Sequence, residues 1–157
     1  MAAATGRVSD LTAEQLRYIA SLQAAPNAEL QAVLATVDSL RAGMLPEATV
    51  VLGAPVRYWR EVDAVHPVEE ARLITTPLLL LQGGRDYQVP ARELGSWRRE
   101  LAGRAHTRFR EFPALNHLFM SGSGPSSPAE YMTPAHVDAE VVDAIATWIA
   151  SARDRRD

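Results

Sequence analysis

The chain has 157 residues, of which 47% are hydrophobic and 22% charged, a composition typical of one soluble domain that can bury a core. The net charge is −3 and all 16 basic residues are scattered arginines, which argues against nucleic acid or an anionic membrane as a partner. The lack of cysteine excludes disulfides, thiolate metal ligands and a cysteine nucleophile. No signal-peptide pattern or membrane-length apolar run occurs in the sequence, so we expect a cytoplasmic protein.

The first part of the chain is dominated by helical periodicity. Four segments are expected to be helical: residues 11–22, 28–43, 58–62 and 67–73. The first two are separated only by a short break at Pro26-Asn27, which predicts two antiparallel helices. The stretch 44–57, which contains Pro46, Gly53 and Pro55, is expected to be irregular.

The second part of the chain has strand patterns. Residues 76–82 form a continuous apolar run bounded by Pro77 and a Gly-Gly pair, as in a strand buried on both faces of a parallel sheet. Residues 90–103 predict a helix, residues 107–112 alternate as a strand near a sheet edge, and residues 134–153 predict a closing helix. This order predicts a right-handed parallel β-α-β-α unit and therefore the α/β class.

An ionisable side chain follows each predicted strand. Asp86 comes just after the Gly-Gly pair, and His117 lies in Leu-Asn-His-Leu-Phe after the second strand. An aspartate and a histidine are two of the three members of a catalytic triad, in which the histidine moves a proton and the aspartate orients its ring. The third member is missing, because the sequence has neither a Gly-x-Ser-x-Gly elbow nor a cysteine.

Simpler interpretations of these residues stay open. Asp86 is also a candidate turn aspartate that binds its own backbone, and His117 a satisfied loop histidine. A metal site formed by Asp86, His117 and His136 has no supporting spacing, so we expect no metal and no cofactor. The serines nearest His117 lie in a Gly-rich and Pro-rich loop that we expect to be mobile, which disfavours them as nucleophiles: Ser121, Ser123, Ser126 and Ser127.

With Pro-Leu-Leu-Leu-Leu-Gln-Gly-x-x-Asp at 77–86 and Leu-Asn-His-Leu-Phe at 115–119, the chain resembles the C-terminal half of an α/β-hydrolase from about Leu11 to Ile149. The resemblance is to bacterial serine hydrolases of the dienelactone-hydrolase and acyl-peptidase-like groups. It implies a partial α/β-hydrolase fold, in which a helical cap precedes a parallel β-α-β-α unit holding the last two core strands. Three parts are then expected: a cap-like segment (1–75), the C-terminal portion of the core (76–153) and a frayed tail (154–157).

The resemblance also assigns roles to side chains. It makes Asp86 the triad acid and His117 the triad base. Tyr58 and Trp59, together with Tyr18, are candidates to line a substrate pocket in the cap-like segment, with core packing as the alternative for each. In this family the nucleophile elbow and oxyanion loop precede the matched region, so we expect a truncated, split or separately encoded half.

The implied activity is hydrolysis of a small carboxylic ester or related acyl substrate, and only when a partner supplies the nucleophile. The alternative is a non-catalytic, hydrolase-derived protein that dimerises and serves as an interaction module. The strand at 78–81 would otherwise keep an uncovered apolar edge, so we expect a homo-oligomer or a complex with a complementing N-terminal half.

Overall fold

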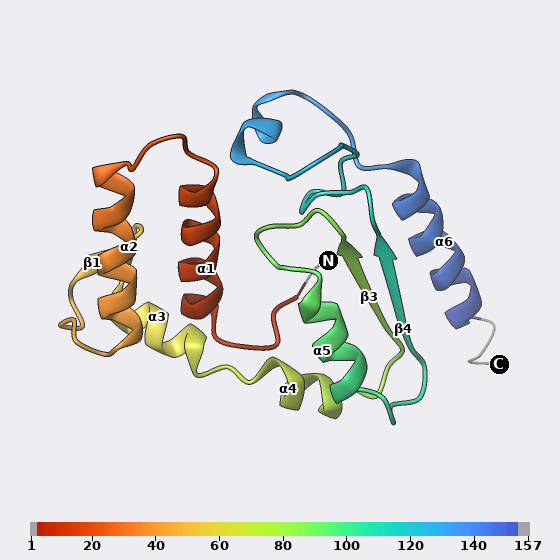
Figure 1. Cartoon of the computed structure of the whole chain (residues 1–157). Helices are drawn as coiled ribbons and strands as arrows, with labels where there is room; N and C mark the ends of the chain where they lie inside the picture. Colours follow the sequence, from red (N-terminus) through yellow and green to blue (C-terminus); the bar gives the residue numbers. More distant parts are fainter. Residues whose placement is uncertain (1–2, 154–157) are drawn as a thin grey trace. The chain divides into compact units, whose positions relative to one another are not determined.

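A computed structural model describes residues 3–153, which form two compact units (Figure 1). Residues 4–69 make up the first unit, and the second contains residues 70–153 together with Ala3. The predicted division into a cap-like segment and a core portion at residues 75 and 76 stays a prediction. The predicted frayed tail, residues 154–157, lies outside the described residues.

The first unit is mainly helical. Its elements are α1 (Val8–Ser21), α2 (Ala28–Arg41), β1 (Val50–Val51), β2 (Ala54–Pro55) and α3 (Val56–Asp63), and α4 (Pro67–Leu73) follows across the boundary. The first two helices lie side by side and run in opposite directions, as predicted (Figure 1). Asn27 begins α2, because its side-chain oxygen accepts a hydrogen bond from the Leu30 amide at 3.0 Å. The core of the unit is formed by Ala13, Val37, Leu40, Val51, Val56 and Trp59.

A two-stranded antiparallel hairpin corrects the prediction of an irregular segment here. Val50 pairs with Pro55 and Val51 with Ala54. The turn residues Leu52 and Gly53 both have positive φ angles, 49° and 83°, which is the conformation of a type I′ hairpin turn. Leucine seldom occupies such a position. Of the Asn-Gly or Asp-Gly pair that usually indicates this turn, the sequence has only the glycine.

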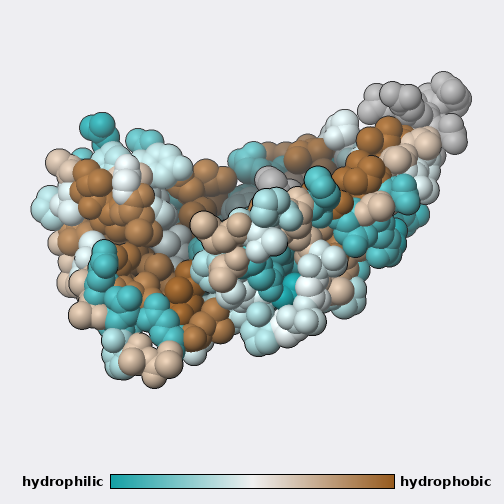
Figure 2. All heavy atoms as spheres, turned by 90° about the horizontal axis from the view of Figure 1, so that it is seen from above, coloured by the Kyte–Doolittle hydropathy of each residue, from teal (hydrophilic) through white to brown (hydrophobic). Residues whose placement is uncertain are grey.

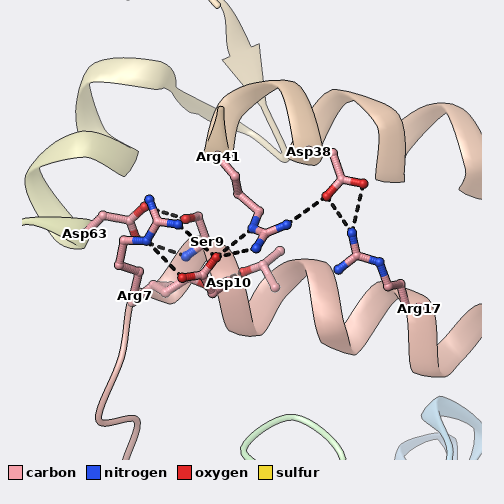
Figure 3. A network of polar contacts seen from close by, with 9 residues as sticks. Arg7, Ser9, Asp10, Arg17, Asp38, Arg41 and Asp63 are labelled. Carbon is pink, nitrogen blue, oxygen red and sulfur yellow. Dashed lines mark hydrogen bonds and ion pairs between the residues drawn. The ribbon is translucent and has the colours of Figure 1, made fainter. Parts of the chain in front are cut away.

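Alternating charges join the first two helices (Figure 3). The carboxylate of Asp10 on α1 accepts from Arg7 at 2.9 Å and from Arg41 of α2 at 2.6 Å. The Asp38 carboxylate of α2 lies 3.0 Å from Arg41 and 2.6 Å from Arg17 of α1. The hydrogen bond from Arg7 lowers the pKa of Asp10, outweighing the opposing effect of burial. These pairs are partly exposed, so the separate contribution of each is small, and their common effect is to fix the register of the two helices.

Helix α3 is joined to the start of α1 by a more sheltered contact (Figure 3). Ser9 is completely buried, and its backbone amide donates to Oδ1 of Asp63 at 2.9 Å. Its hydroxyl donates to the other carboxylate oxygen, Oδ2. Asp63 therefore satisfies two donors in the first turn of α1, where backbone N–H groups have no partner within the helix.

The second unit contains the predicted parallel β-α-β-α arrangement. Its elements are β3 (Leu78–Gly83), α5 (Arg92–Glu100), β4 (Thr107–Phe112), the 3-10 helix η1 (Pro128–Met132) and α6 (Ala139–Arg153). The two strands pair in parallel, from Leu78 opposite Thr107 to Gly83 opposite Phe112, which confirms that part of the prediction. Helix α5 buries Leu94 and Trp97, and a cluster of Leu81, Phe112, Leu115 and Val141 packs between the sheet and α6.

The closing helix starts later than predicted. It begins at Ala139 instead of Pro134. The Asp138 amide donates to the carbonyl of Phe119 at 2.9 Å, and the Asp138 carboxylate accepts from the Glu140 amide at 2.9 Å. A tertiary contact and a side-chain cap therefore set the start of α6, and residues 134–138 approach it without regular structure.

Apolar surface is exposed on both units (Figure 2). On α6 the exposed large apolar residues include Val142, Ile145 and Ile149. Among the described residues β3 pairs with β4 alone, so its second edge has no strand partner. No helix within residues 3–153 combines the length and the apolar character needed to cross a membrane.

Candidate functional site

Asp86 lies in the tight turn that follows β3, and its side chain is fully buried at 0% exposure. Its Oδ1 atom accepts hydrogen bonds from the backbone amides of Gln88 and Val89, both at 2.8 Å. An aspartate that binds the amides two and three residues ahead stabilises a turn of this kind. Because one carboxylate oxygen is occupied by the turn, the carboxylate has a fixed orientation, and its second oxygen points to a different partner.

That partner is His117, as predicted. The Nδ1 atom of His117 lies 2.8 Å from Oδ2 of Asp86, and the His117 side chain is 24% exposed. The amide of Gln82, a buried residue, makes a longer contact of 3.4 Å with the same oxygen. Asp86 therefore closes the turn with one oxygen and contacts His117 with the other, and its role as a triad acid stays a prediction. With Nδ1 held by the carboxylate, Nε2 is the ring nitrogen available to exchange a proton.

The loop that carries His117 is shaped by Asn116, which is 1% exposed. Its Oδ1 atom accepts from the amides of Leu118 at 3.0 Å and Met120 at 3.1 Å. The backbone carbonyl of Asn116 also accepts from the Phe119 amide at 3.0 Å. Phe119 has a φ of 57°, an uncommon conformation for a residue with a side chain, and these bonds hold it there.

The two loops of the site approach each other because of Gly83 and Gly84. A β-carbon on Gly83 would lie 2.5 Å from the carbonyl oxygens of Leu115 and Asn116, and one on Gly84 would lie 2.7 Å from Cα of Pro113. The Gly84 amide can therefore donate to the Phe112 carbonyl at 2.8 Å. The Gly-Gly pair brings the Asp86 turn and the His117 loop within hydrogen-bonding distance of each other.

Three further side chains support the pair and were not singled out from the sequence: Arg85, Asn116 and Glu130. Glu130 of η1 binds Asn116 and forms an ion pair with Arg85. Burial opposes the charge of Glu130, but the hydrogen bonds from Asn116, Arg85 and Ser126 outweigh it and lower its pKa. A glutamate in a Pro-rich loop carries no sequence signal for such a role. Asn116 directly precedes His117 in the motif, and this position was the one sequence feature that could have indicated its role in supporting the histidine.

The serine-containing loop makes several tertiary hydrogen bonds, and its expected mobility stays a prediction. Ser126 is 1% exposed and its hydroxyl donates to Glu130 at 2.9 Å. The Arg85 guanidinium donates to the carbonyls of Gly124 at 2.8 Å and Ser123 at 3.2 Å. These bonds are the tertiary contacts that a Gly-rich and Pro-rich sequence does not reveal.

Tyr58 and Trp59 belong to the first unit, whereas Asp86 and His117 belong to the second. Trp59 is 8% exposed, lies in the core of its unit and donates from Nε1 to the Val51 carbonyl at 3.0 Å. Tyr58 is 50% exposed, and its ring meets that of Trp59 edge-on. Core packing thus accounts for Trp59, and a substrate-lining role for either residue stays a prediction.

The described histidines and carboxylates do not form a metal-binding group. Among residues 3–153, no three His, Cys, Asp or Glu side chains lie close enough together to hold a metal ion, and this includes Asp86, His117 and His136. The site consists instead of one buried carboxylate, one imidazole and the hydrogen-bonded loops that carry them. Its chemistry is that of an oriented proton acceptor and donor.

Comparison with known proteins gives one significant relative. The chain is 39% identical over 142 residues to the protein named Esterase EstD of Thermotoga maritima. The match covers 90% of this chain and 34% of the relative, so the chain spans about a third of the length of that protein. No protein-family model matches the chain, and no solved structure matches it significantly.

Proposed function

We propose that the chain carries the acid and base of a serine-dependent carboxylic ester hydrolase with an α/β-hydrolase core. The observation that supports this most is the 2.8 Å contact between Nδ1 of His117 and the buried carboxylate of Asp86, at the ends of two parallel strands. The similarity to a protein named as an esterase points to the same chemistry. The narrower assignment is to bacterial serine hydrolases of the dienelactone-hydrolase and acyl-peptidase-like groups.

In this proposal His117 acts through Nε2. It takes the proton from a serine hydroxyl as the serine oxygen bonds to the ester carbonyl carbon, and it returns that proton to the alcohol that leaves. Water then bonds to the acyl carbon while His117 takes its proton, and His117 returns that proton to the serine oxygen as the bond between that oxygen and the acyl carbon breaks and the acid is released. Asp86 stabilises the positively charged imidazole formed between the two proton transfers, and its bonds to Gln88 and Val89 keep it in place.

The nucleophile is proposed to come from a partner. The 157 residues contain no Gly-x-Ser-x-Gly elbow, and Ser126, in the loop near the base, is buried and donates to Glu130. A complementing segment with that elbow, or an oligomer that contains one, would complete the triad and supply the oxyanion donors. The substrate is proposed to be a small ester or related acyl compound.

The free edge of β3 is the proposed place for such a partner. The strand pairs with β4 alone among the described residues, and an uncovered strand edge favours the addition of another strand. Sedimentation at micromolar concentration should show a dimer, a higher oligomer or a complex with an added segment. A stable monomer, with or without that segment, would remove this part of the proposal.

Complementation tests the function directly. The full chain alone should hydrolyse p-nitrophenyl acetate no faster than free imidazole and should not be labelled by a fluorophosphonate. Mixed with a segment that carries a Gly-x-Ser-x-Gly elbow, it should produce turnover and label the serine of the segment. His117→Ala should lower that turnover on the order of 10²–10⁴-fold, whereas the control His136→Ala should not change it.

Two results would contradict the proposal. One is labelling of a serine within residues 121–127 of the isolated chain, which would place the nucleophile inside the chain. The other is turnover in the mixture that His117→Ala leaves unchanged, which would show that the imidazole takes no part. Absence of turnover with every elbow-bearing segment tried, although the segments bind, would favour a non-catalytic interaction module.

A further inference from the structure

Glu130 connects the two residues that directly precede the members of the Asp86 and His117 pair. Its Oε2 atom accepts from Nδ2 of Asn116 at 3.0 Å, and Asn116 precedes His117. Its Oε1 atom accepts from Nη2 of Arg85 in an ion pair, and Arg85 precedes Asp86. One carboxylate therefore holds both loops of the site at the position next to each functional side chain.

The link to Asn116 determines where its side-chain amide points. Because the Nδ2 group donates to Glu130, the Oδ1 atom is directed to the amides of Leu118 and Met120. These two bonds close the turn around His117. If Glu130 did not accept from Nδ2, the amide of Asn116 would lose the contact that fixes its orientation, and the turn would lose its closing acceptor.

The ion pair with Arg85 holds the other loop of the site, the turn that carries Asp86. The Arg85 side chain is 9% exposed and lies between the Asp86 turn and the serine-containing loop. Its own backbone amide donates to the Leu115 carbonyl at 2.9 Å, which joins the two loops directly. A β-carbon on Gly122 would lie 2.1 Å from Nη1 of Arg85, so the guanidinium fills the space beside that glycine.

The position of Glu130, which lies in η1, is itself fixed by contacts of its neighbours in the chain. The Ser126 hydroxyl donates to the same Oε2 atom at 2.9 Å. Tyr131, the next residue, accepts from Nε2 of Gln88 at 3.3 Å, and its ring lies 6.3 Å from that of Tyr87. The 3-10 helix is therefore anchored to the turn that orients Asp86. An ionised glutamate here makes charge-assisted hydrogen bonds, which are stronger than neutral ones.

We propose that Glu130 is a positioning residue that holds Nδ1 of His117 against the Asp86 carboxylate through Asn116 and Arg85. The inference rests on the proposed function for its catalytic meaning, but its physical content is the order of the His117 loop. Glu130 is assigned no contact with substrate. Its effect is on the lifetime and geometry of the bond between His117 and Asp86.

The test exchanges donor and acceptor between Glu130 and Asn116 in the full chain. Glu130→Gln removes the charge and replaces one carboxylate oxygen by an NH₂ group, which would face the donor of either Arg85 or Asn116. Asn116→Asp keeps the acceptor for Leu118 and Met120 but sets a carboxylate against Glu130. In the double variant Asn116→Asp/Glu130→Gln, the glutamine amide can donate to the aspartate, which restores the link with its direction reversed. Glu140→Gln is the matched control, because Glu140 also pairs with an arginine of this unit, Arg110.

The readout is the ring of His117 by proton and nitrogen NMR. In the unchanged protein the proton on Nδ1 should give a downfield resonance that exchanges slowly with water. Each single variant should raise that exchange rate by about tenfold or more, as expected when a charge-assisted hydrogen bond that closes the loop is lost. The double variant should recover most of the protection, and Glu140→Gln should match the unchanged protein.

Equal exchange rates in all five proteins would overturn the positioning role. So would a double variant no better than the single variants, or loss of the folded state in the single and double variants alike, because Glu130 would then serve only general stability. Failure of the proposed function is a separate outcome. It would appear as a resonance that follows this pattern in a complemented protein without turnover, whereas a missing Nδ1 resonance in the unchanged protein would overturn the positioning role as well.

Discussion

Gly83 approaches Asn116 so closely that a β-carbon on Gly83 would lie 2.5 Å from the carbonyl oxygen of Asn116. The atoms in the way are backbone atoms of the loop that carries His117, so they cannot be relieved by rotating a side chain. The contact joins the end of β3 to the loop that follows β4. Any side chain at position 83 must therefore push apart the two loops that hold the candidate acid and base.

We expect Gly83→Ala to destabilise the second unit by about 1–3 kcal/mol, the usual cost of forcing extra atoms into a packed site. Gly95→Ala is the matched control, because Gly95 lies inside α5 and a β-carbon there would meet only the end of Arg99, at 3.8 Å. That change should stabilise the protein by about 0.5–1 kcal/mol through helix propensity. Urea unfolding of both variants makes the comparison, and a neutral Gly83→Ala would show that the loops can separate freely.

Asp86→Asn should change the tautomer of His117. The asparagine oxygen can keep the bonds to Gln88 and Val89, which directs its NH₂ group towards the imidazole. Nδ1 of His117 would then accept instead of donate, and the neutral ring would carry its proton on Nε2. Nitrogen chemical shifts of the ring at neutral pH report the change. Unaltered shifts would mean that the carboxylate does not set the tautomer.

Acid should weaken the first unit through Asp10. Its folded-state pKa is lowered, mainly by the hydrogen bond from Arg7. A lowered pKa means that the stabilising contribution is present above the ordinary value of 3.8 and is lost as the pH falls through the folded-state value. Asp10→Asn should therefore flatten the dependence of stability on pH in the acid range.

Hydrogen exchange of the α1 amides, measured from about pH 5 down to about pH 1 (the range over which a paired carboxylate loses its contribution), follows that dependence after correction for intrinsic rates. The side chain of Asp10 is 40% exposed, so high salt should reduce the difference between Asp10→Asn and the unchanged chain. A difference that salt leaves intact would show that the carboxylate acts through packing and not through its charge.

Trp59→Phe should destabilise the first unit by about 1 kcal/mol or more, because it leaves the Val51 carbonyl without its donor inside the core. Tyr58→Phe should change stability by less than about 0.5 kcal/mol, since that side chain is half exposed. Thermal unfolding of the two variants provides the measurement. Equal and small effects would show that the hydrogen bond from Trp59 to the Val51 carbonyl contributes little to the core.

The sequence patterns predicted helices and strands correctly where apolar residues recur at the period of the element. Helix α4 has the predicted limits, Pro67 and Leu73, because proline at the first position and a short apolar face are local features. The apolar run that became β3 and the alternating run that became β4 were assigned correctly for the same reason. The parallel pairing followed from the helix between them.

Asp86 and His117 could be placed from the sequence because each lies in the loop after a strand, and the carboxyl ends of parallel strands lie at one edge of a sheet. Their partnership was expected from resemblance to a family, and the 2.8 Å contact agrees with it. The hairpin at Leu52-Gly53 and the start of α6 at Ala139 were missed. Each depends on a contact or a backbone conformation that no periodic pattern records.

Only the tertiary structure decided which polar side chains support the pair. Glu130 meets Arg85 across 45 residues of sequence and Asn116 across 14, and nothing in the composition of the Pro-rich segment distinguishes this glutamate from an exposed one. Periodicity reports which residues face a core, because burial repeats with the helix or strand. Loop geometry determines that the Glu130 carboxylate meets Arg85 and Asn116. That geometry exists only after the strands and the Gly83-Gly84 turn have packed.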